Sequence, residues 1–235
     1  MSFVGRNIVK NNNQTTVHLG AHGAACIHHV RFQSGDLIAQ NIHPDIPKPA
    51  EYNRWRIKRK ETFLAGRMAV RSAQQALGLT HFDVLRGGDG APIWPSHILG
   101  SVSHTENEAI ALMIDARQSS LMGVGVDLEK INSGSQLEDE SMIGLPEEFR
   151  ILHSIGFQSE CARLLLFSLK ESVYKALYPS VGQFFDFLDV ALEAEQEGVF
   201  SLLVQRDLSE KIAMGCRIYG GYKQVNENMI TFAYF

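Results

Sequence analysis

The sequence has few cysteines and no long apolar run, and both shortages narrow the class of protein. It contains 3 cysteines in 235 residues, and they lie far apart without forming a CxxC pair. This pattern is typical of reduced thiols in a cytoplasmic protein and offers no disulfide framework. No apolar run approaches the roughly 18–20 residues that span a bilayer. The first residues show no charged segment followed by an apolar one, so we expect no secretory signal.

Neither sign of charge is in large excess. The chain has 22 Lys and Arg against 26 Asp and Glu, which gives a net charge of −4. This balance provides no overall cationic attraction to nucleic acid or to a membrane surface, so we expect neither as a partner. Because 45% of the residues are hydrophobic, the chain can build a sizeable core in one or two domains and is not a disordered chain.

Two stretches with helical periodicity and several short apolar runs predict an α+β fold. The helical patterns cover residues 53–77 and 159–178, followed by Gly78 and Pro179. Strands are predicted at 24–27, 98–103, 109–115, 121–129 and within 186–235, whereas residues 1–23 predict no regular element. We therefore predict two similar α+β halves, residues 1–130 and 131–235. No sequence repeat relates them, so a pseudo-twofold relation would be structural only. Each half has one long helix against a small, mostly antiparallel sheet.

Two acids on a predicted strand are candidates for binding a metal. Asp127 and Glu129 are two residues apart, so a strand points both side chains to the same side. Val126 and Leu128 then point into the core. Two carboxylates suit Mg²⁺, which takes one or two carboxylates together with phosphate oxygens. The spacing alone does not decide between a metal site and two hydrated acids at the end of a strand, and by itself it favours the hydrated acids.

The second predicted helix carries an acid between two lysines. Glu171 and Lys175 are four residues apart and share a helix face, and Lys170 precedes Glu171. In isolation this pattern is an ordinary helical ion pair worth about 0.3–0.5 kcal/mol. The functional alternative makes Glu171 a third metal ligand or a base, with both lysines supplying positive charge for phosphates.

Basic residues and a glycine-rich segment lie in the first half of the chain. Arg59 and Arg67 are separated by about 12 Å along the predicted helix, far enough to hold two ends of one polyanion. A charged outer helix face is the commoner explanation. The segment 86–90 has the backbone freedom to wrap a nucleotide, and Ser103 and His104 end a predicted strand.

Five motifs follow one another along the chain in a specific order. They are Arg59–Arg67 (RKETFLAGR), Gly90–Pro95 (GAPIWP), Gly100–Thr105 (GSVSHT), Gly125–Glu129 (GVDLE) and Phe167–Ala176 (FSLKESVYKA). Over residues 54–190 this series resembles the 4′-phosphopantetheinyl transferases of the Sfp superfamily, and within it the subgroup of enterobactin synthase component D. Many relatives have Trp at the position of Phe167, but this subgroup commonly has Phe.

The resemblance implies an enzyme that moves the 4′-phosphopantetheine arm of coenzyme A onto a serine of an apo acyl or peptidyl carrier protein and releases adenosine 3′,5′-bisphosphate. Asp127, Glu129 and Glu171 would bind Mg²⁺, with Mn²⁺ as an alternative metal. Glu171 would also be the base for the serine, and Lys175 and Asp127 would complete the catalytic set. The residues expected at coenzyme A are Arg59, Arg67, Arg86, Gly87, Gly88, Asp89, Ser103, His104, Asp127, Lys170 and Lys175.

The resemblance further implies a monomer with its active site between the halves, acting on the carriers of siderophore, other non-ribosomal peptide, polyketide or fatty-acid synthases. Two other functions use similar residues. A Mg²⁺-dependent phosphodiesterase or nuclease would also need clustered acids and basic groups, although the acidic composition argues against nucleic acid. A scaffold that binds coenzyme A or a carrier without catalysis would lack some of these acids or lysines, and all of them are present. We therefore expect the transferase.

Overall fold

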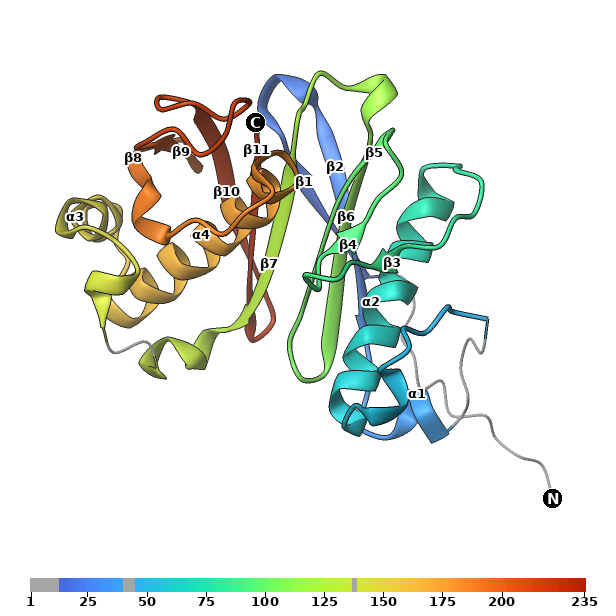
Figure 1. Ribbon diagram of the computed structural model, residues 1–235. Coiled ribbons are helices and arrows are strands. Elements are labelled where there is room, and N and C mark those ends of the chain that lie inside the picture. Colours follow the sequence, from blue (N-terminus) through green and yellow to red (C-terminus); the bar gives the residue numbers. More distant parts are fainter. Residues whose placement is uncertain (1–12, 40–44, 137–138) are drawn as a thin grey trace.

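Two α+β halves lie side by side in the molecule (Figure 1). The computed structural model describes residues 13–39, 45–136 and 139–235. Each half has one long helix packed on an antiparallel sheet, and a small two-stranded sheet accompanies the first half. No helix in this described part is long and apolar enough to cross a membrane. The predicted α+β class with two halves is confirmed.

The first half is a four-stranded sheet covered by α2. Its strand order is β1-β2-β6-β5, with every neighbouring pair antiparallel. The strands are β1 (Asn13–His18), β2 (Ala24–Arg31), β5 (Ile98–His104) and β6 (Glu108–Asp115). The helices are α1 (Asp36–Ala39) and α2 (Ile57–Ala76), and 3₁₀ turns lie at Gly20–His22, Tyr52–Arg54 and Ala116–Gln118. The small sheet consists of β3 (Leu85–Arg86) and β4 (Pro92–Ile93).

The second half is a five-stranded sheet covered by α4. Its order is β7-β11-β10-β9-β8, again antiparallel throughout. The strands are β7 (Val124–Lys130), β8 (Val190–Gln196), β9 (Val199–Val204), β10 (Arg217–Val225) and β11 (Asn228–Tyr234). The helices are α3 (Pro146–Ser154) and α4 (Ser159–Val181), and 3₁₀ turns lie at Ile131–Gln136, Glu140–Met142 and Phe187–Asp189.

β7 belongs to the second sheet, so the border predicted after residue 130 assigns this strand to the wrong half. β7 pairs with β11 along its length, from Val124 opposite Tyr234 to Lys130 opposite Asn228. Its partner lies at the far end of the chain, so the local sequence of β7 carries no sign of the pairing. The border between the sheets falls before β7.

Three element boundaries also differ from the sequence prediction. Residues 13–18, predicted without regular structure, form β1 because antiparallel pairing with β2 satisfies the backbone of this polar segment; residues 1–12 lie outside the described part. α2 begins at Ile57, after a separate 3₁₀ turn. α4 continues through Pro179 and ends at Val181, where Gly182, with a φ of 72°, forms the left-handed cap that stops the helix.

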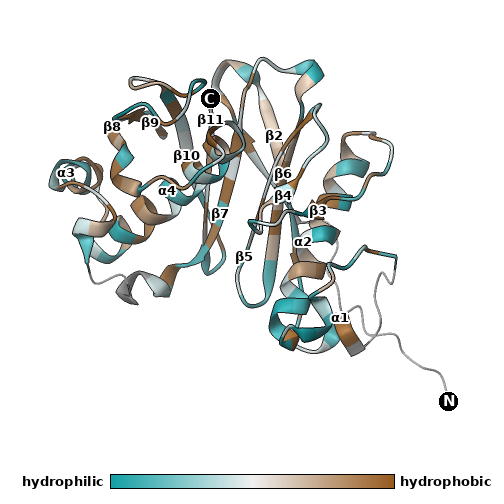
Figure 2. Ribbon diagram, in the orientation of Figure 1, coloured by the Kyte–Doolittle hydropathy of each residue, from teal (hydrophilic) through white to brown (hydrophobic). Residues whose placement is uncertain are grey.

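The sheet faces that the helices leave free pack against each other. This shared core combines apolar side chains of both sheets, including Val17, Ile27, Ile110, Leu112, Val126, Leu128 and Ile230. Brown, hydrophobic residues are visible along β7, where the halves meet (Figure 2). Because side chains alternate along a strand, Asp127 points to the opposite side, toward α4. The packing of two sheets thus turns the acidic side chain of β7 toward the helix.

Candidate active site

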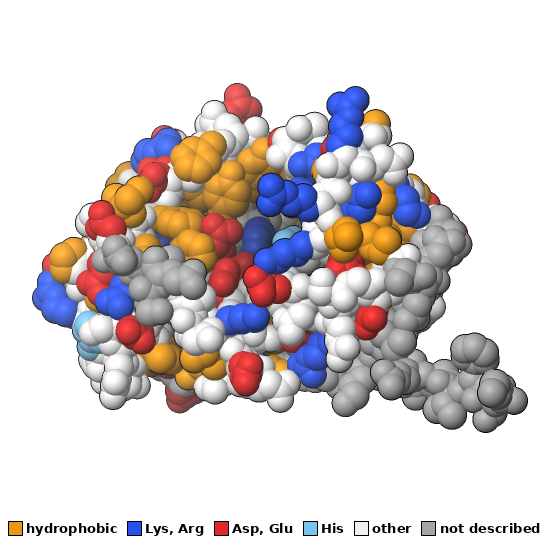
Figure 3. Space-filling model, turned by 90° about the horizontal axis from the view of Figure 1, so that it is seen from below, with side chains coloured by type: hydrophobic (Ala, Val, Ile, Leu, Met, Phe, Trp, Pro, Cys, Tyr) orange, Lys and Arg blue, Asp and Glu red, His pale blue; other side chains and the backbone are white. Residues whose placement is uncertain are grey.

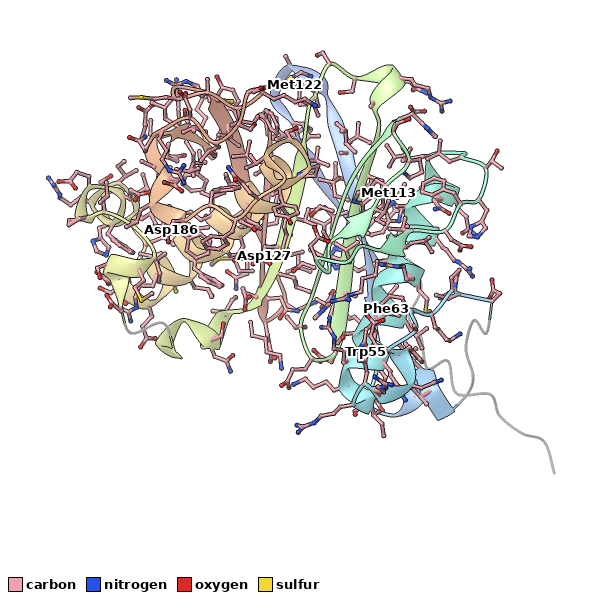
Figure 4. All side chains as sticks on the ribbon, in the orientation of Figure 1. Trp55, Phe63, Met113, Met122, Asp127 and Asp186 are labelled. Atoms are coloured by element: carbon pink, nitrogen blue, oxygen red, sulfur yellow. The ribbon has the colours of Figure 1, made fainter. Side chains whose placement is uncertain are left out.

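Asp127 is the centre of a buried polar cluster between the two halves (Figure 4). It is only 3% exposed. Its Oδ1 accepts hydrogen bonds from the Ser103 hydroxyl at 2.8 Å and from Lys175 Nζ at 2.6 Å, and its Oδ2 accepts one from Ser168 at 2.8 Å. Burial opposes the ionisation of Asp127, but the Lys175 charge and these hydrogen bonds outweigh it and keep its pKa below the usual range. Asp127 is therefore a carboxylate held from both halves.

The glycines that precede Asp127 let α4 pack directly on β7. A Cβ at Gly125 would lie 1.8 Å from the Ser172 carbonyl oxygen, and one at Gly123 would lie 2.4 Å from that of Ala176. Side chains do not approach backbone so closely, so glycine is required at both positions. The close approach of the helix brings the side chains of Ser168 and Lys175 on α4 within hydrogen-bond distance of Asp127.

A chain of buried hydroxyl groups continues from Asp127 into the second half. Ser168 Oγ lies 2.9 Å from Thr231 Oγ1, which lies 2.7 Å from Ser172 Oγ. All three side chains are fully buried, and buried hydroxyls need such partners. The sequence analysis missed these residues. Ser168 and Ser172 share the helix face of Lys175, which is a usable signal, whereas Thr231 on β11 gives none.

Three carboxylates share this region and repel one another. Burial, and next the Asp127 charge, raise the pKa of Glu129 to about 7. Burial also raises the pKa of Glu171, with Asp127 adding to the shift. Lys175 offsets part of this repulsion, because its Nζ lies 2.6 Å from Asp127 and 3.9 Å from Glu171. The excess of negative charge fits a divalent cation, although among the described residues no three His, Cys, Asp or Glu side chains are already arranged as a ligand set.

Ser101 and Ser103 of β5 join the two sheets. The Ser101 hydroxyl accepts a hydrogen bond from the Val126 N–H of β7 at 3.0 Å. The Ser103 hydroxyl accepts one from the Leu128 N–H at 3.3 Å. Ser103 also donates to Asp127 and accepts from Lys175 at 3.2 Å, so protein atoms use its whole hydrogen-bonding capacity. In this structure Ser103 positions the acid and the lysine, and a phosphate contact would have to displace one of these bonds.

Three arginines line a small cavity in the first half. Arg59, Arg67 and Arg86 surround a volume of about 140 Å³, and His104 lies in the same wall. Partial burial, followed by the charges of Lys175 and Arg59, lowers the pKa of His104. The cavity therefore concentrates positive charge and suits an anionic ligand.

Aromatic rings hold the guanidinium groups of this cavity in place, with Trp55 and Phe63 on the side of the first half (Figure 4). The Arg59 guanidinium lies 5.0 Å from the centroid of the Trp55 ring, and that of Arg67 lies 4.7 Å from Phe63. Arg67 Nε is buried, with no hydrogen-bond partner within the described structure. Burial, and then repulsion from Arg86, lower the pKa of Arg67 to about 10. A buried donor without an acceptor is unfavourable until a ligand supplies one.

The arginine cavity adjoins a second cavity, and together they form one cleft. Gly90, Pro92 and Val102 line both the arginine cavity and a second cavity of about 360 Å³. Glu171 and Lys175 lie in the wall of this second cavity. In the space-filling view, acidic and basic side chains surround a central hollow (Figure 3).

An apolar groove adjoins the cleft at Glu171. Its volume is about 620 Å³, and its lining includes Phe167, Tyr174, Phe184 and Glu171 itself. Phe184 is 77% exposed, and hydrophobic side chains lie beside the charged hollow in Figure 3. Apolar surface next to converging charges is typical of a binding site. Glu171 therefore lies between a charged cleft and an apolar groove.

The glycine-rich segment forms the turn between β3 and β4. Gly87 and Gly88 shape this turn, and Asp89 reaches the second half by accepting a hydrogen bond from the Tyr178 hydroxyl at 2.8 Å. The sequence analysis missed Tyr178, although it lies seven residues after Glu171 and so shares its helix face. Tyr178 and Glu171 both line the 360 Å³ cavity.

Lys170 does not reach the cleft, which corrects its assignment to coenzyme A. It is 2% exposed, its Nζ lies 2.9 Å from Glu148 Oε1, and it donates to the Phe187 carbonyl at 3.0 Å. Burial lowers its pKa, although the Glu148 charge opposes this shift. Five residues at about 100° each turn Lys170 far from the face of Lys175. Lys170 ties α4 to α3 instead.

Two family models match this chain, one on each half. Residues 49–114 match the 4′-phosphopantetheinyl transferase N-terminal domain, and residues 123–219 match the 4′-phosphopantetheinyl transferase superfamily. The second match begins just before β7, in agreement with the sheet to which that strand belongs.

Individual relatives are similar over part of their length. A protein named 4′-phosphopantetheinyl transferase Svp, from Streptomyces mobaraensis, is 34% identical over 149 residues, which cover 61% of this chain and 58% of that protein. Enterobactin synthase component D of Salmonella austin is 37% identical over 121 residues, covering 51% of this chain and 48% of that protein. The protein of the same name from Escherichia coli O157:H7 is 33% identical over 153 residues, covering 64% and 69%. The chain thus spans between about half and two thirds of these relatives.

Proposed function

Because this chain belongs to the 4′-phosphopantetheinyl transferase superfamily, we propose that it transfers the 4′-phosphopantetheine arm of coenzyme A to a serine of an apo acyl or peptidyl carrier protein. The observation that carries the proposal is the continuity of the cleft. An arginine cavity, in which the buried Arg67 Nε has no acceptor among the described residues, adjoins a cavity that holds Glu171 and Lys175. One ligand with phosphates at separate positions could place one phosphate in the arginine cavity and another beside Lys175.

The nucleotide end of coenzyme A would lie in the arginine cavity. Arg59 and Arg67 would contact its phosphates, with Arg86 and His104 adding charge, and the segment 86–89 would line the adenosine. Arginine suits this role because its planar guanidinium can donate two hydrogen bonds to one phosphate. The missing partner of Arg67 Nε supports this placement.

Asp127, Glu129 and Glu171 would hold the metal, Mg²⁺ or alternatively Mn²⁺. When bound, the metal would withdraw charge from the diphosphate oxygens and make its phosphorus a better electrophile. Burial, and next the charge of Asp127, raise the pKa values of Glu129 and Glu171; these shifts support the assignment, because a bound cation would favour the ionised form of both acids.

The arm and the acceptor serine would meet at Glu171. The apolar groove beside this acid, with Phe167 and Tyr174 in its wall, suits the uncharged arm. Glu171, directly or through a water, would accept the serine proton as the serine oxygen bonds to the arm's phosphorus and the bond to adenosine 3′,5′-bisphosphate breaks. Lys175 would stabilise the charge on the departing phosphate.

The proposal extends to a cytoplasmic monomer that accepts carriers of siderophore, other non-ribosomal peptide, polyketide or fatty-acid synthases. Cysteine usage supports the compartment. If charge guides docking of the carrier near α4, the affinity for the carrier should fall as salt rises. An affinity independent of salt would contradict electrostatic docking without contradicting the transfer reaction.

Intact-mass spectrometry of an apo carrier protein tests the reaction. The carrier is incubated with this protein, coenzyme A and Mg²⁺, with EDTA as the control. A metal-dependent gain of one phosphopantetheine on the carrier serine supports the proposal. Coenzyme A binding without any gain on peptide, polyketide or fatty-acid carriers would indicate a scaffold. Cleavage of coenzyme A without a carrier would indicate a phosphodiesterase.

A further inference from the structure

A hydrogen bond between Tyr178 and Asp89 links the two halves at the cleft, apart from the bonds around Asp127. Tyr178 on α4 donates to Asp89 Oδ2 at 2.8 Å, and both residues line the 360 Å³ cavity and a neighbouring cavity of about 680 Å³. The hydrogen bond lowers the pKa of Asp89 and raises that of Tyr178. At neutral pH the pair is thus a charged acceptor with a neutral donor.

The two carboxylate oxygens of Asp89 hold different parts of the molecule. Oδ1 accepts from the Ala91 N–H at 3.0 Å and so fixes the turn itself. A second bond, from the Gly87 N–H to the Ala91 carbonyl at 2.7 Å, closes the same turn. Oδ2 is left for Tyr178. Loss of the tyrosine hydroxyl would therefore release the turn from α4 and leave it closed only by these internal bonds, which would then open more often.

The same turn carries one wall of the arginine cavity. A Cβ at Gly90 would lie 2.8 Å from an Arg86 guanidinium nitrogen, so the turn packs directly on this arginine. Arg86 also pairs with Glu51 at 2.8 Å and lies 5.8 Å from the Trp55 ring centroid. Movement of the turn relative to α4 would therefore shift the wall of the arginine cavity that carries Arg86 relative to Glu171 and Lys175.

Tyr178 is itself braced by aromatic contacts. Its ring stacks on Tyr174 at 5.4 Å between centroids, and Tyr174 stacks on Phe185 at 4.7 Å. Tyr174 lines both the 360 Å³ cavity and the apolar groove. The tyrosine hydroxyl thus has a fixed position on α4, from which it can hold the turn.

We propose that Tyr178 is a positioning residue that, through Asp89, holds the nucleotide-side turn against α4 at the spacing the ligand needs. This inference rests on the proposed function, since it names a determinant of coenzyme A affinity. The residue acts on binding of the nucleotide end and not on the chemical step.

The test compares Tyr178→Phe with Tyr222→Phe. The second variant is a matched removal of a hydroxyl from a half-buried tyrosine that packs on the core of the second half. In the ligand-free protein, amide exchange at Gly87 and Gly90 should rise about fivefold in Tyr178→Phe alone. The dissociation constant of adenosine 3′,5′-bisphosphate and the KM for coenzyme A should rise by a similar factor, with kcat at saturation unchanged. Unchanged exchange overturns the tether whether or not the protein transfers anything.

A double-mutant cycle separates the tether from direct contact. In an Asp89→Ala background, Tyr178→Phe should weaken nucleotide binding no further, because its partner is already absent. An equal further loss would overturn the proposal in favour of a tyrosine that touches the ligand. Faster exchange with unchanged nucleotide affinity would also overturn it. Absence of any carrier transfer, by contrast, would count against the proposed function and leave the exchange result valid.

Discussion

The two walls of the cleft satisfy their charged groups differently. On the acidic wall, Asp127 is buried but receives three hydrogen bonds from Ser103, Ser168 and Lys175. On the basic wall, Arg67 is held by the face of Phe63 and keeps a buried Nε without an acceptor within the described structure. The acidic wall is thus organised by the protein itself, whereas the basic wall is completed by a ligand. The difference predicts that mutations on the two walls have different consequences.

The largest expected effect is on the acidic wall, at Glu171, which also lines the apolar groove. Glu171→Gln should lower carrier transfer by about 10²–10⁴-fold while keeping the fold and coenzyme A binding, because the amide cannot accept the serine proton. Transfer kinetics by intact mass and coenzyme A titration measure both quantities. Glu147→Gln, which changes an exposed acid of α3, is the control. Near-normal transfer by Glu171→Gln would show that another group is the base.

The next largest effect is on the basic wall. Arg67→Met keeps an aliphatic stem over Phe63 but removes the guanidinium, whose buried Nε has no acceptor among the described residues, so coenzyme A should bind about 10- to 100-fold more weakly. The ligand-free variant should be no less stable than the parent, because a buried charge repelled by Arg86 is gone. Calorimetric binding and thermal unfolding provide the two measurements. Arg117→Met, at an exposed arginine paired with Asp115, should leave affinity unchanged. A large loss of ligand-free stability would contradict the comparison of the walls.

A smaller effect is expected at Ser168, where the acidic wall meets the core of the second half. Ser168→Ala leaves Asp127 Oδ2 without its donor and should lower the free energy of unfolding by about 1–3 kcal/mol. Urea unfolding without ligand measures this change. Ser154→Ala removes a hydroxyl that bonds only to the Ile151 carbonyl of its own helix, and it should cost less. Equal losses in the two variants would mean that Asp127 does not depend on its partner.

The smallest effect is the dependence of stability on pH. The pKa of Glu129 is raised from 4.5 to about 7, so the folded state holds this proton more tightly than the unfolded state does. Its contribution to stability is complete below pH 4.5 and is lost as the pH rises through about 7. Urea unfolding between pH 5 and 8, without metal, should show that the parent loses more stability with rising pH than Glu129→Gln does. Parallel pH profiles would contradict the raised pKa of Glu129, which supports the metal assignment.

Periodicity predicted most of the fold, because both long helices and the strands around the cleft have strong local patterns. The strand alternation that turns Val126 and Leu128 inward also predicted the direction of Asp127. The border between the halves was wrong because β7 pairs with β11, about a hundred residues away. Lys170 was misassigned because adjacent lysine and acid positions on a helix face different surroundings, and only packing against α3 distinguishes them.

The sequence by itself determined the elements, the family motifs and the chemical types of the site residues, since these depend on local spacing. Only the tertiary structure decided which of these residues meet. Glycine at 125 lets α4 approach β7, the serines of β5 join the two sheets, and Tyr178 reaches Asp89 across the cleft. The physical reason is that charges and hydrogen bonds act over a few ångströms, and contacts between residues far apart in the chain exist only after both sheets and both helices have packed.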